Sequence, residues 1–545
     1  MLSAFRKGPW PQSHHDLIEH YYKQYDKAIA AGDYQPFLYP WGTFGAVVVI
    51  VYLLIPHQNR PWLEKCRYLA FAWITAFATY TILYTRAKGM ATALGIGLIS
   101  AWSVCWISAI LICNDAQTDF CRIERLEGAF RSSTPSHIIS KDVNNTSKAQ
   151  DEKRHNTINH EITEGQLGPA SRYGQFAWQS YPYMPFIERL DWVCDIFCNF
   201  RGVGWNWRTS ALPPPPKHIQ EQLYRNSGAI VPKSSNHVHT GQVQLYPTRA
   251  ALLRANLKTL IIGYLVLDFL KTTMMHDPYF WGLTDRLPPS YLPFNVIHGH
   301  PIWTHIYRLT LSMLAVKQAL QTIFSLGPLF FSGILGPRLL GARAEPFMYP
   351  ETWASYSVVL DKGLAGWWGS WWHQTFRFAF AEPSRVVLER MGWDRKSGKA
   401  KALQLGVAFA LSGIVHASGS WTCAGRTRPF RGPIVFFLLQ AVGIFVETVL
   451  TRAFRPLGLQ HQVPNRLIQT WALVYVHVWF YHTGHLLCND FAQGGVWLFE
   501  PIPISVFRGL GFGADARDGW WCWGGLDELV RWHHGESWWT TGIAF

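Results

Sequence analysis

The chain has 545 residues, of which 49% are hydrophobic and 15% aromatic, while only 15% are charged. Soluble globular proteins average about 25% charged residues, so this composition points away from a soluble protein and towards the membrane. The formal net charge of +14 would suggest nucleic-acid binding in a soluble chain. In a multispanning chain, basic residues beside the membrane instead set the topology and meet anionic lipid, so no nucleic-acid partner is expected.

Residues 1–38 are polar and aromatic and lack the apolar stretch of a secretory signal. We expect them to form an amphipathic lead that does not cross the membrane. The first transmembrane segments are expected within 39–113, where three apolar runs approach the roughly 20 residues that a bilayer requires, the first run being short. These runs are 41–56, 68–85 and 90–113.

Residues 114–256 form a hydrophilic insert that we expect to be partly disordered. It combines charge-rich and Ser/Asn-rich stretches with four consecutive prolines at 213–216. Overlapping sequons at Asn144 and Asn145 would be glycosylated only in a lumenal loop. The orientation of the chain is left open, because consecutive loops on opposite sides of the membrane are both basic.

Residues 257–490 resume the apolar pattern and are predicted to form the membrane core. The further predicted spans are 260–273, 307–335, 402–419, 432–450 and 468–488. With the first three runs they predict an all-α fold, a polytopic transmembrane helical bundle of about eight spans, since helices satisfy their own backbone groups in lipid. Residues 491–545 form a tail with seven Trp, interpreted as interfacial packing against the bundle.

Residues 366–421 contain the strongest candidate site. Their first part places four Trp around His373 and Gln374, and their second part is an uncharged apolar run interrupted by a single imidazole, His416. A lone histidine on an apolar helix is most often a hydrogen-bonded core residue, but an ionisable group in a membrane segment also marks a functional site. Ser412 precedes His416 by four residues and shares its helical face.

Residues 367–377, WWGSWWHQTFR, resemble the Trp-rich element of the membrane-bound O-acyltransferase superfamily, and within it the wax-synthase-like family. Residues 412–416, SGIVH, look like that family's second histidine element, and the two histidines are 43 positions apart. Residues 201–207, RGVGWNW, resemble an element of the fungal acetyltransferases of secondary metabolism. The chain departs from the family pattern at Trp367 and Ser370, where Phe and a basic residue are usual, which puts in doubt any role for a basic side chain at position 370.

The resemblance implies an acyl-CoA-dependent O-acyltransferase in which His416 is the general base. A histidine suits this role because its unperturbed pKa lies near neutrality. His373 would orient the substrate or donate a hydrogen bond to the thioester oxygen, with Gln374 supporting it. Further candidates for contact with substrate or CoA are Trp372, Arg377 and Ser412.

The resemblance also implies acetyl-CoA as co-substrate, no permanently bound cofactor, and a hydrophobic alcohol as acceptor. The likeness to fungal acetyltransferases points to a hydroxyl of a terpenoid or meroterpenoid in secondary-metabolite biosynthesis. A multi-pass protein of the endoplasmic reticulum is expected, and the oligomeric state is left open. The alternative within the family is a long-chain acyl-CoA:alcohol wax ester synthase.

Other readings of the sequence are weaker. A transporter would show internal symmetry and repeated half-helices, neither of which is evident, and a non-catalytic scaffold would not need the paired histidine elements. His485 and Asp490 fit the HxxxxD box of glycerolipid acyltransferases, but the companion motifs of that box are absent. No metal site is predicted, because Cys194 and Cys198 lack a second pair and the histidines within 298–305 lack further ligands.

Overall fold

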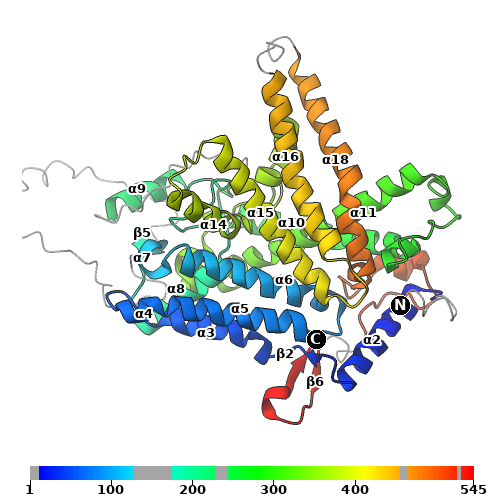
Figure 1. Cartoon of the computed structure of the whole chain (residues 1–545), viewed down its shortest axis with the longest axis horizontal. Helices are drawn as coiled ribbons and strands as arrows, with labels where there is room; N and C mark the ends of the chain where they lie inside the picture. Colours follow the sequence, from blue (N-terminus) through cyan, green and yellow to red (C-terminus); the bar gives the residue numbers. More distant parts are fainter. Residues whose placement is uncertain (1–10, 127–174, 227–242, 455–462, 525–529) are drawn as a thin grey trace, which may run out of the picture.

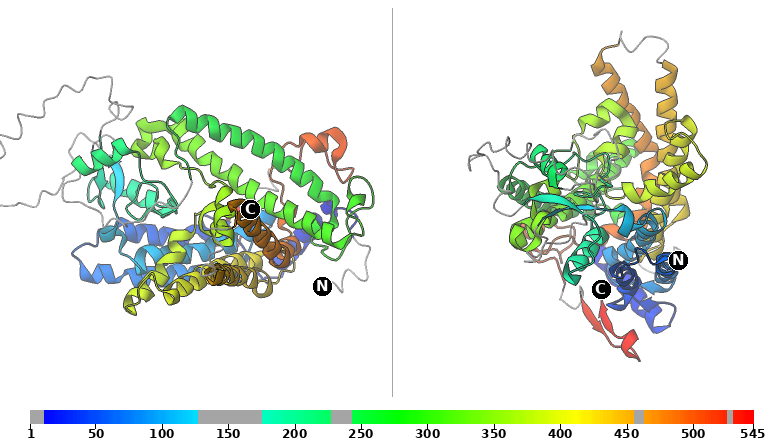
Figure 2. Two further views of the ribbon diagram at one scale, coloured as in Figure 1. Left: turned by 90° about the horizontal axis from the view of Figure 1, so that it is seen from above. Right: turned by 90° about the vertical axis from the view of Figure 1, so that its left-hand side faces the viewer.

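A computed structural model describes residues 11–126, 175–226, 243–454, 463–524 and 530–545. The described chain is built almost entirely of helices, which confirms the predicted all-α class (Figures 1 and 2). The sequons at Asn144 and Asn145 lie outside the described residues.

The first described helix, α2 (His14–Ala30), begins with a capping box formed by Ser13 and Asp16. Short strands then connect distant parts of the chain: β1 (Gln35–Pro36) with β3 (Thr85–Arg86), and β2 (Leu38–Tyr39) with β7 (Gly542–Ala544), which also pairs with β6 (Arg531–His533). The antiparallel pairing of β2 with β7 therefore holds the end of the chain beside its first spans (Figure 1).

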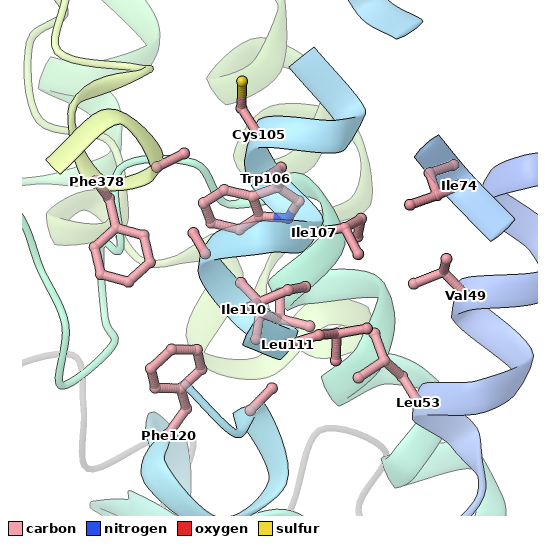
Figure 3. Packing of buried hydrophobic residues seen from close by; sticks show 14 of the residues in the cluster. Val49, Leu53, Ile74, Cys105, Trp106, Ile107, Ile110, Leu111, Phe120 and Phe378 are labelled. Carbon is pink, nitrogen blue, oxygen red and sulfur yellow. The ribbon is translucent and has the colours of Figure 1, made fainter. Parts of the chain in front are cut away.

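The first apolar region forms a helical layer. Its helices are α3 (Phe44–Leu54), α4 (Pro61–Lys65), α5 (Arg67–Tyr84) and α6 (Met90–Ile107), which continues into a π-helical turn, η2 (Ser108–Ile112). The largest buried hydrophobic cluster lies here, where Trp106, Ile110 and Leu111 pack against Leu53 of α3 and Phe378 (Figure 3). Phe378 belongs to the segment after the Trp-rich element, so this core supports the candidate site from one side.

The described parts of the insert are folded. They contain α7 (Ala116–Asp119), β4 (Arg122–Arg125), β5 (Phe176–Gln179), α8 (Phe186–Cys198) and α9 (Lys217–Asn226), and β4 pairs antiparallel with β5. Buried Arg122 pairs with Asp195 at 3.1 Å, while Arg343 pairs with Asp191 at 2.8 Å and also with Glu124. The ion pairs of Arg343 join the insert to the segment that follows α12 (Gly336–Leu340).

The membrane core contains the remaining helices. They are α10 (Arg249–His276), α11 (Pro301–Pro328), α13 (Ser357–Gly366), α14 (Arg377–Arg390), α15 (Gly398–Thr422), α16 (Val435–Phe454) and α18 (Asn465–Gln493). Three π-helical turns accompany them: η6 (Leu329–Leu335), η9 (Trp367–Trp371) and η10 (Phe430–Ile434). In Figures 1 and 2, α16 and α18 project together from the body of the protein, whereas α10 and α11 pack along one side of it.

Six described helical segments are long and apolar enough to cross a membrane: 61–84, 90–112, 249–276, 301–344, 398–422 and 430–453. Six of the eight predicted spans coincide with them. The first predicted span forms the shorter apolar helix at 41–54, and the last forms α18, which is 29 residues long but is not among the six. The predicted long span at 307–335 is observed as α11 continued by the π-helical turn η6.

Two charged residues inside α10 bind the C-terminal tail. Asp268, which is fully buried, accepts hydrogen bonds from the backbone N–H of Val506 at 2.7 Å and of Phe507 at 3.2 Å. Lys271 donates to the Trp497 carbonyl at 2.7 Å. The tail is thus joined to the bundle through buried polar contacts. Only Trp497 among the seven tail Trp is buried, whereas Trp520, Trp521, Trp532, Trp538 and Trp539 are exposed.

Candidate functional site

A break in α13 turns the chain into the Trp-rich element. Gly363 adopts φ 56° and ψ −138°, a conformation that favours glycine. The two backbone N–H groups that follow the break, of Leu364 and Ala365, donate to the Glu447 carboxylate of α16 at 3.0 and 3.2 Å. A Cβ atom at Gly363 would lie 1.7 Å from Glu447 Oε1. The break therefore requires both the glycine and the glutamate.

The Trp-rich element continues as the π-helical turn η9, a geometry that often occurs at functional sites. Its aromatic rings form a contiguous wall: the Trp367 and Trp371 ring centroids are 4.3 Å apart, and Trp372 meets Trp353 at 4.7 Å. Trp368 reaches Phe437 of α16 at 5.9 Å. The four Trp of the motif thus pack against one another and against neighbouring helices.

Gln374 and Arg377 hold the turn that carries His373. The buried Gln374 amide donates to the carbonyls of Trp368, at 3.1 Å, and Trp372. Arg377 Nη1 donates to Gln374 Oε1 at 3.0 Å and to the Gly369 carbonyl. The polar groups of Gln374 are therefore engaged within the turn, and among the described residues no hydrogen bond joins Gln374 to His373.

His373 lies deep in the protein among aromatic rings. Its ring centroid is 5.4 Å from that of Trp372, 5.8 Å from Trp353 and 6.0 Å from Phe324 of α11. Burial, together with the charges of His416 and Arg201, lowers the pKa of His373 to about 3, so the imidazole is neutral near pH 7. Its Nδ1 atom is buried and has no hydrogen-bond partner among the described residues.

His416 lies on α15, and a backbone contact favours the tautomer with its proton on Nδ1. Its Nδ1 atom is 2.8 Å from the Ser412 carbonyl, and because a carbonyl can only accept, Nδ1 carries the proton. The Nε2 atom is then left with its lone pair. The ring packs against Phe437 at a centroid separation of 4.4 Å. Ser412 contributes to this arrangement through its backbone oxygen, which any residue at that position would supply.

The structure brings the two imidazoles into one region. His416 is among the charges that lower the pKa of His373, which places the rings within electrostatic range, and Phe437 contacts both His416 and Trp368. Each of the two histidine side chains is half-buried.

Three cations near His373 have no carboxylate partner among the described residues. Arg201 donates to the carbonyls of Pro350 at 2.9 Å and Glu351 at 3.0 Å, and burial lowers its pKa to about 10. Lys317 of α11 lies 5.7 Å from the Trp353 ring, and Arg377 is held in the turn described above. From the sequence, Arg201 is included only as part of the motif at 201–207, and Lys317 is not predicted to lie near the site. Neither residue is near His373 in the chain, so the sequence does not indicate that they come together.

A cavity of about 290 Å³ lies elsewhere, at the start of α11. It is lined by His300, His305 and His485, among other residues. No residue of the Trp-rich element or of residues 412–416 lines it. In the proposed HxxxxD box, Asp490 accepts a hydrogen bond from the Arg428 backbone N–H at 2.6 Å. That contact gives Asp490 a structural role at the chain reversal before α16.

Comparisons with known proteins address the same segment. Residues 348–439, which include both histidine elements, match the model of the Membrane bound O-acyl transferase family. No solved structure matches the chain.

Several fungal proteins are similar over longer stretches. The O-mevalon transferase yanI of Aspergillus niger is 24% identical over 48% of this chain and 53% of its own length. The acetyltransferase eriL of Hericium erinaceus is 23% identical over 51% of this chain and 66% of its own length. The acetyltransferase sirH of Leptosphaeria maculans is 22% identical over 67% of this chain and 78% of its own length. The chain thus matches about half to two thirds of the length of the first two relatives. Residues 348–439 are thus similar to the membrane bound O-acyl transferase family, and a longer part of the chain is similar to these fungal transferases.

Proposed function

We propose that this protein is a membrane O-acyltransferase that transfers an acetyl group from acetyl-CoA to a hydroxyl of a terpenoid or meroterpenoid. The observation that carries the proposal is the state of His416. Its Nδ1–H is bound to the Ser412 carbonyl, so Nε2 is free to accept a proton inside a membrane-spanning helix.

The reaction follows from that state. His416 Nε2 takes the proton of the acceptor hydroxyl as its oxygen attacks the thioester carbon, and a tetrahedral oxyanion forms. The C–S bond then breaks, the ester is released, and the CoA thiolate takes the proton from the imidazolium. His373 lies beside this centre and has an unpartnered Nδ1 atom, which supports a role in holding the substrate or the thioester oxygen.

An anionic acyl donor accounts for the cations around His373. Arg201, Lys317 and Arg377 have no carboxylate partners among the residues described, and an uncompensated buried charge is costly. The oxyanion that forms on the thioester carbon of acyl-CoA would offset part of that cost. The Trp wall formed by Trp353 and the Trp-rich element favours a short acyl chain, because a long chain needs an apolar channel open along its length. The names of the fungal acetyltransferase relatives agree with this choice.

The test compares acyl donors on membranes that contain the protein. We expect acetyl-CoA to acetylate at least one alcohol of a terpenoid panel, and palmitoyl-CoA with fatty alcohols to give no ester. The opposite pattern would identify a wax ester synthase. His416→Ala should lower turnover by about 10²-fold or more, the contribution of a general base.

A matched control is available on α18. His477 Nδ1 also binds the carbonyl four residues earlier, Leu473, at 2.8 Å, but its side chain is exposed. His477→Ala should therefore retain activity. Equal activity of His416→Ala and His477→Ala, with both proteins folded and inserted, would remove His416 from the mechanism.

A further inference from the structure

A second histidine cluster lies where α2 meets the C-terminal tail. His14 and His15 are the first two residues of α2, and their Nε2 atoms are 3.3 and 2.9 Å from the same atom, Asp518 Oδ1. The His14 and Asp518 side chains are each only 2% exposed, whereas His15 is 32% exposed. The two imidazole ring centroids are 4.1 Å apart.

The donor atoms match the requirements of a small metal ion. Two imidazole nitrogens and one carboxylate oxygen form the protein ligand set of zinc sites in which a water molecule fills the fourth position. Zinc–ligand bonds of about 2.0–2.1 Å in tetrahedral geometry place neighbouring donors about 3.3 Å apart. The observed separations of 2.9 and 3.3 Å, and the grouping of all three donors within 4.8 Å, agree with that spacing after small side-chain shifts.

The carboxylate is also oriented as a ligand. Asp518 Oδ2 accepts hydrogen bonds from the backbone N–H groups of Ala514 at 2.8 Å and Asp515 at 3.2 Å, which leaves Oδ1 directed at the histidines. Such outer contacts hold metal ligands in place. The neighbouring Arg517 is paired with Asp16 at 2.7 Å and Asp515 at 2.9 Å, so its positive charge is compensated beside the site.

We propose that His14, His15 and Asp518 bind a divalent transition-metal ion, with zinc the best match, and that this ion ties α2 to the C-terminal tail. The His15 side chain is partly exposed, so the ion can enter from this side and a water molecule can reach the fourth coordination position there. The ion would join residues that are about 500 positions apart, and the site contains no residue of the proposed acyltransferase centre.

The test measures metal content. The full chain, purified in detergent through a tag without histidines, is stripped with a chelating resin, re-exposed to zinc and passed through a desalting column. Mass-spectrometric metal analysis should find about one equivalent of zinc, and competition with a chromophoric chelator gives the affinity. His15→Gln and Asp518→Asn keep hydrogen-bonding groups but lose the ligand set, so each should weaken zinc binding about tenfold or more.

His20→Gln is the matched control, because His20 is an exposed histidine on the same helix. It should bind zinc like the wild type. Zinc should also raise the unfolding temperature of the wild type and of His20→Gln, but not of the two ligand variants. A wild type that takes up no metal, or ligand variants that bind zinc as tightly as the wild type, would overturn the proposal. The readout does not involve acyl transfer, so its outcome is independent of the proposed function.

Discussion

The chemistry of the candidate centre depends on the states of two histidines. His416 has its tautomer set by a backbone carbonyl, a contact that needs only a helix and a residue four positions earlier. His373 has its protonation set by its surroundings, namely burial, His416 and Arg201. The tautomer of His416 is therefore set locally, whereas the protonation of His373 depends on distant parts of the chain.

The depressed pKa of His373 predicts acid sensitivity. Its folded pKa is about 3 and its ordinary value is 6.5, so between these values the unfolded chain binds more protons than the folded chain. Stability should therefore fall as the pH drops below 6.5, with a contribution of up to about 1.4 kcal/mol per pH unit from this group.

Thermal unfolding in detergent at pH 7 and pH 5 measures this effect. His373→Asn should lose less stability between the two pH values than the wild type does, since the group that resists protonation is gone. His477→Asn, at an exposed position, should behave like the wild type. An unchanged pH response in His373→Asn would show that His373 is not held neutral by the fold.

At the scale of elements, the break in α13 decides where the Trp-rich element lies. Without the break, the helix would continue past Gly363, and Trp367 to His373 would take other directions. Glu447 is a charged residue in an apolar span, and its partners are the two N–H groups that the break exposes. The intramembrane glutamate is thus explained by the break that it supports.

Gly363→Ala should disrupt both stability and activity. The backbone conformation alone costs a residue with a side chain about 1–3 kcal/mol, and the new Cβ atom would displace the Glu447 carboxylate. Gly369→Ala, in the same Trp-rich element, is the control, since its Cβ atom would meet nothing within 4 Å. Unfolding temperature and acyl transfer are measured for both. Wild-type behaviour of Gly363→Ala would contradict the role given to the break.

At the scale of the whole molecule, the tail is joined to the bundle by buried contacts at both of its ends. Asp268 binds residues 505–507, and β7 completes the small sheet with β2. The ionisable groups in α10 thus serve assembly, although such residues in a membrane segment suggest function at first sight.

Asp268→Ala should loosen the tail. It leaves the buried N–H groups of Val506 and Phe507 without their acceptor, at a cost of about 1–3 kcal/mol for each unpaired group. Limited proteolysis followed by mass spectrometry should detect faster cleavage near residues 505–512, while Asp285→Ala, at the edge of the separate cavity, should not change the cleavage pattern. Equal cleavage of Asp268→Ala and wild type would mean that other contacts hold the tail.

The helical membrane fold and the two histidine elements could be predicted from the sequence, because apolar runs and short motifs are local in the chain and lipid permits little except helices. It did not reveal that Gln374 forms hydrogen bonds within its own turn, or that the Glu447 carboxylate accepts hydrogen bonds from the break in α13. The charges around His373 and the contacts of His14 and His15 with Asp518 became visible in the folded chain alone. Those contacts join segments hundreds of residues apart, and packing, which no local pattern encodes, brings them together.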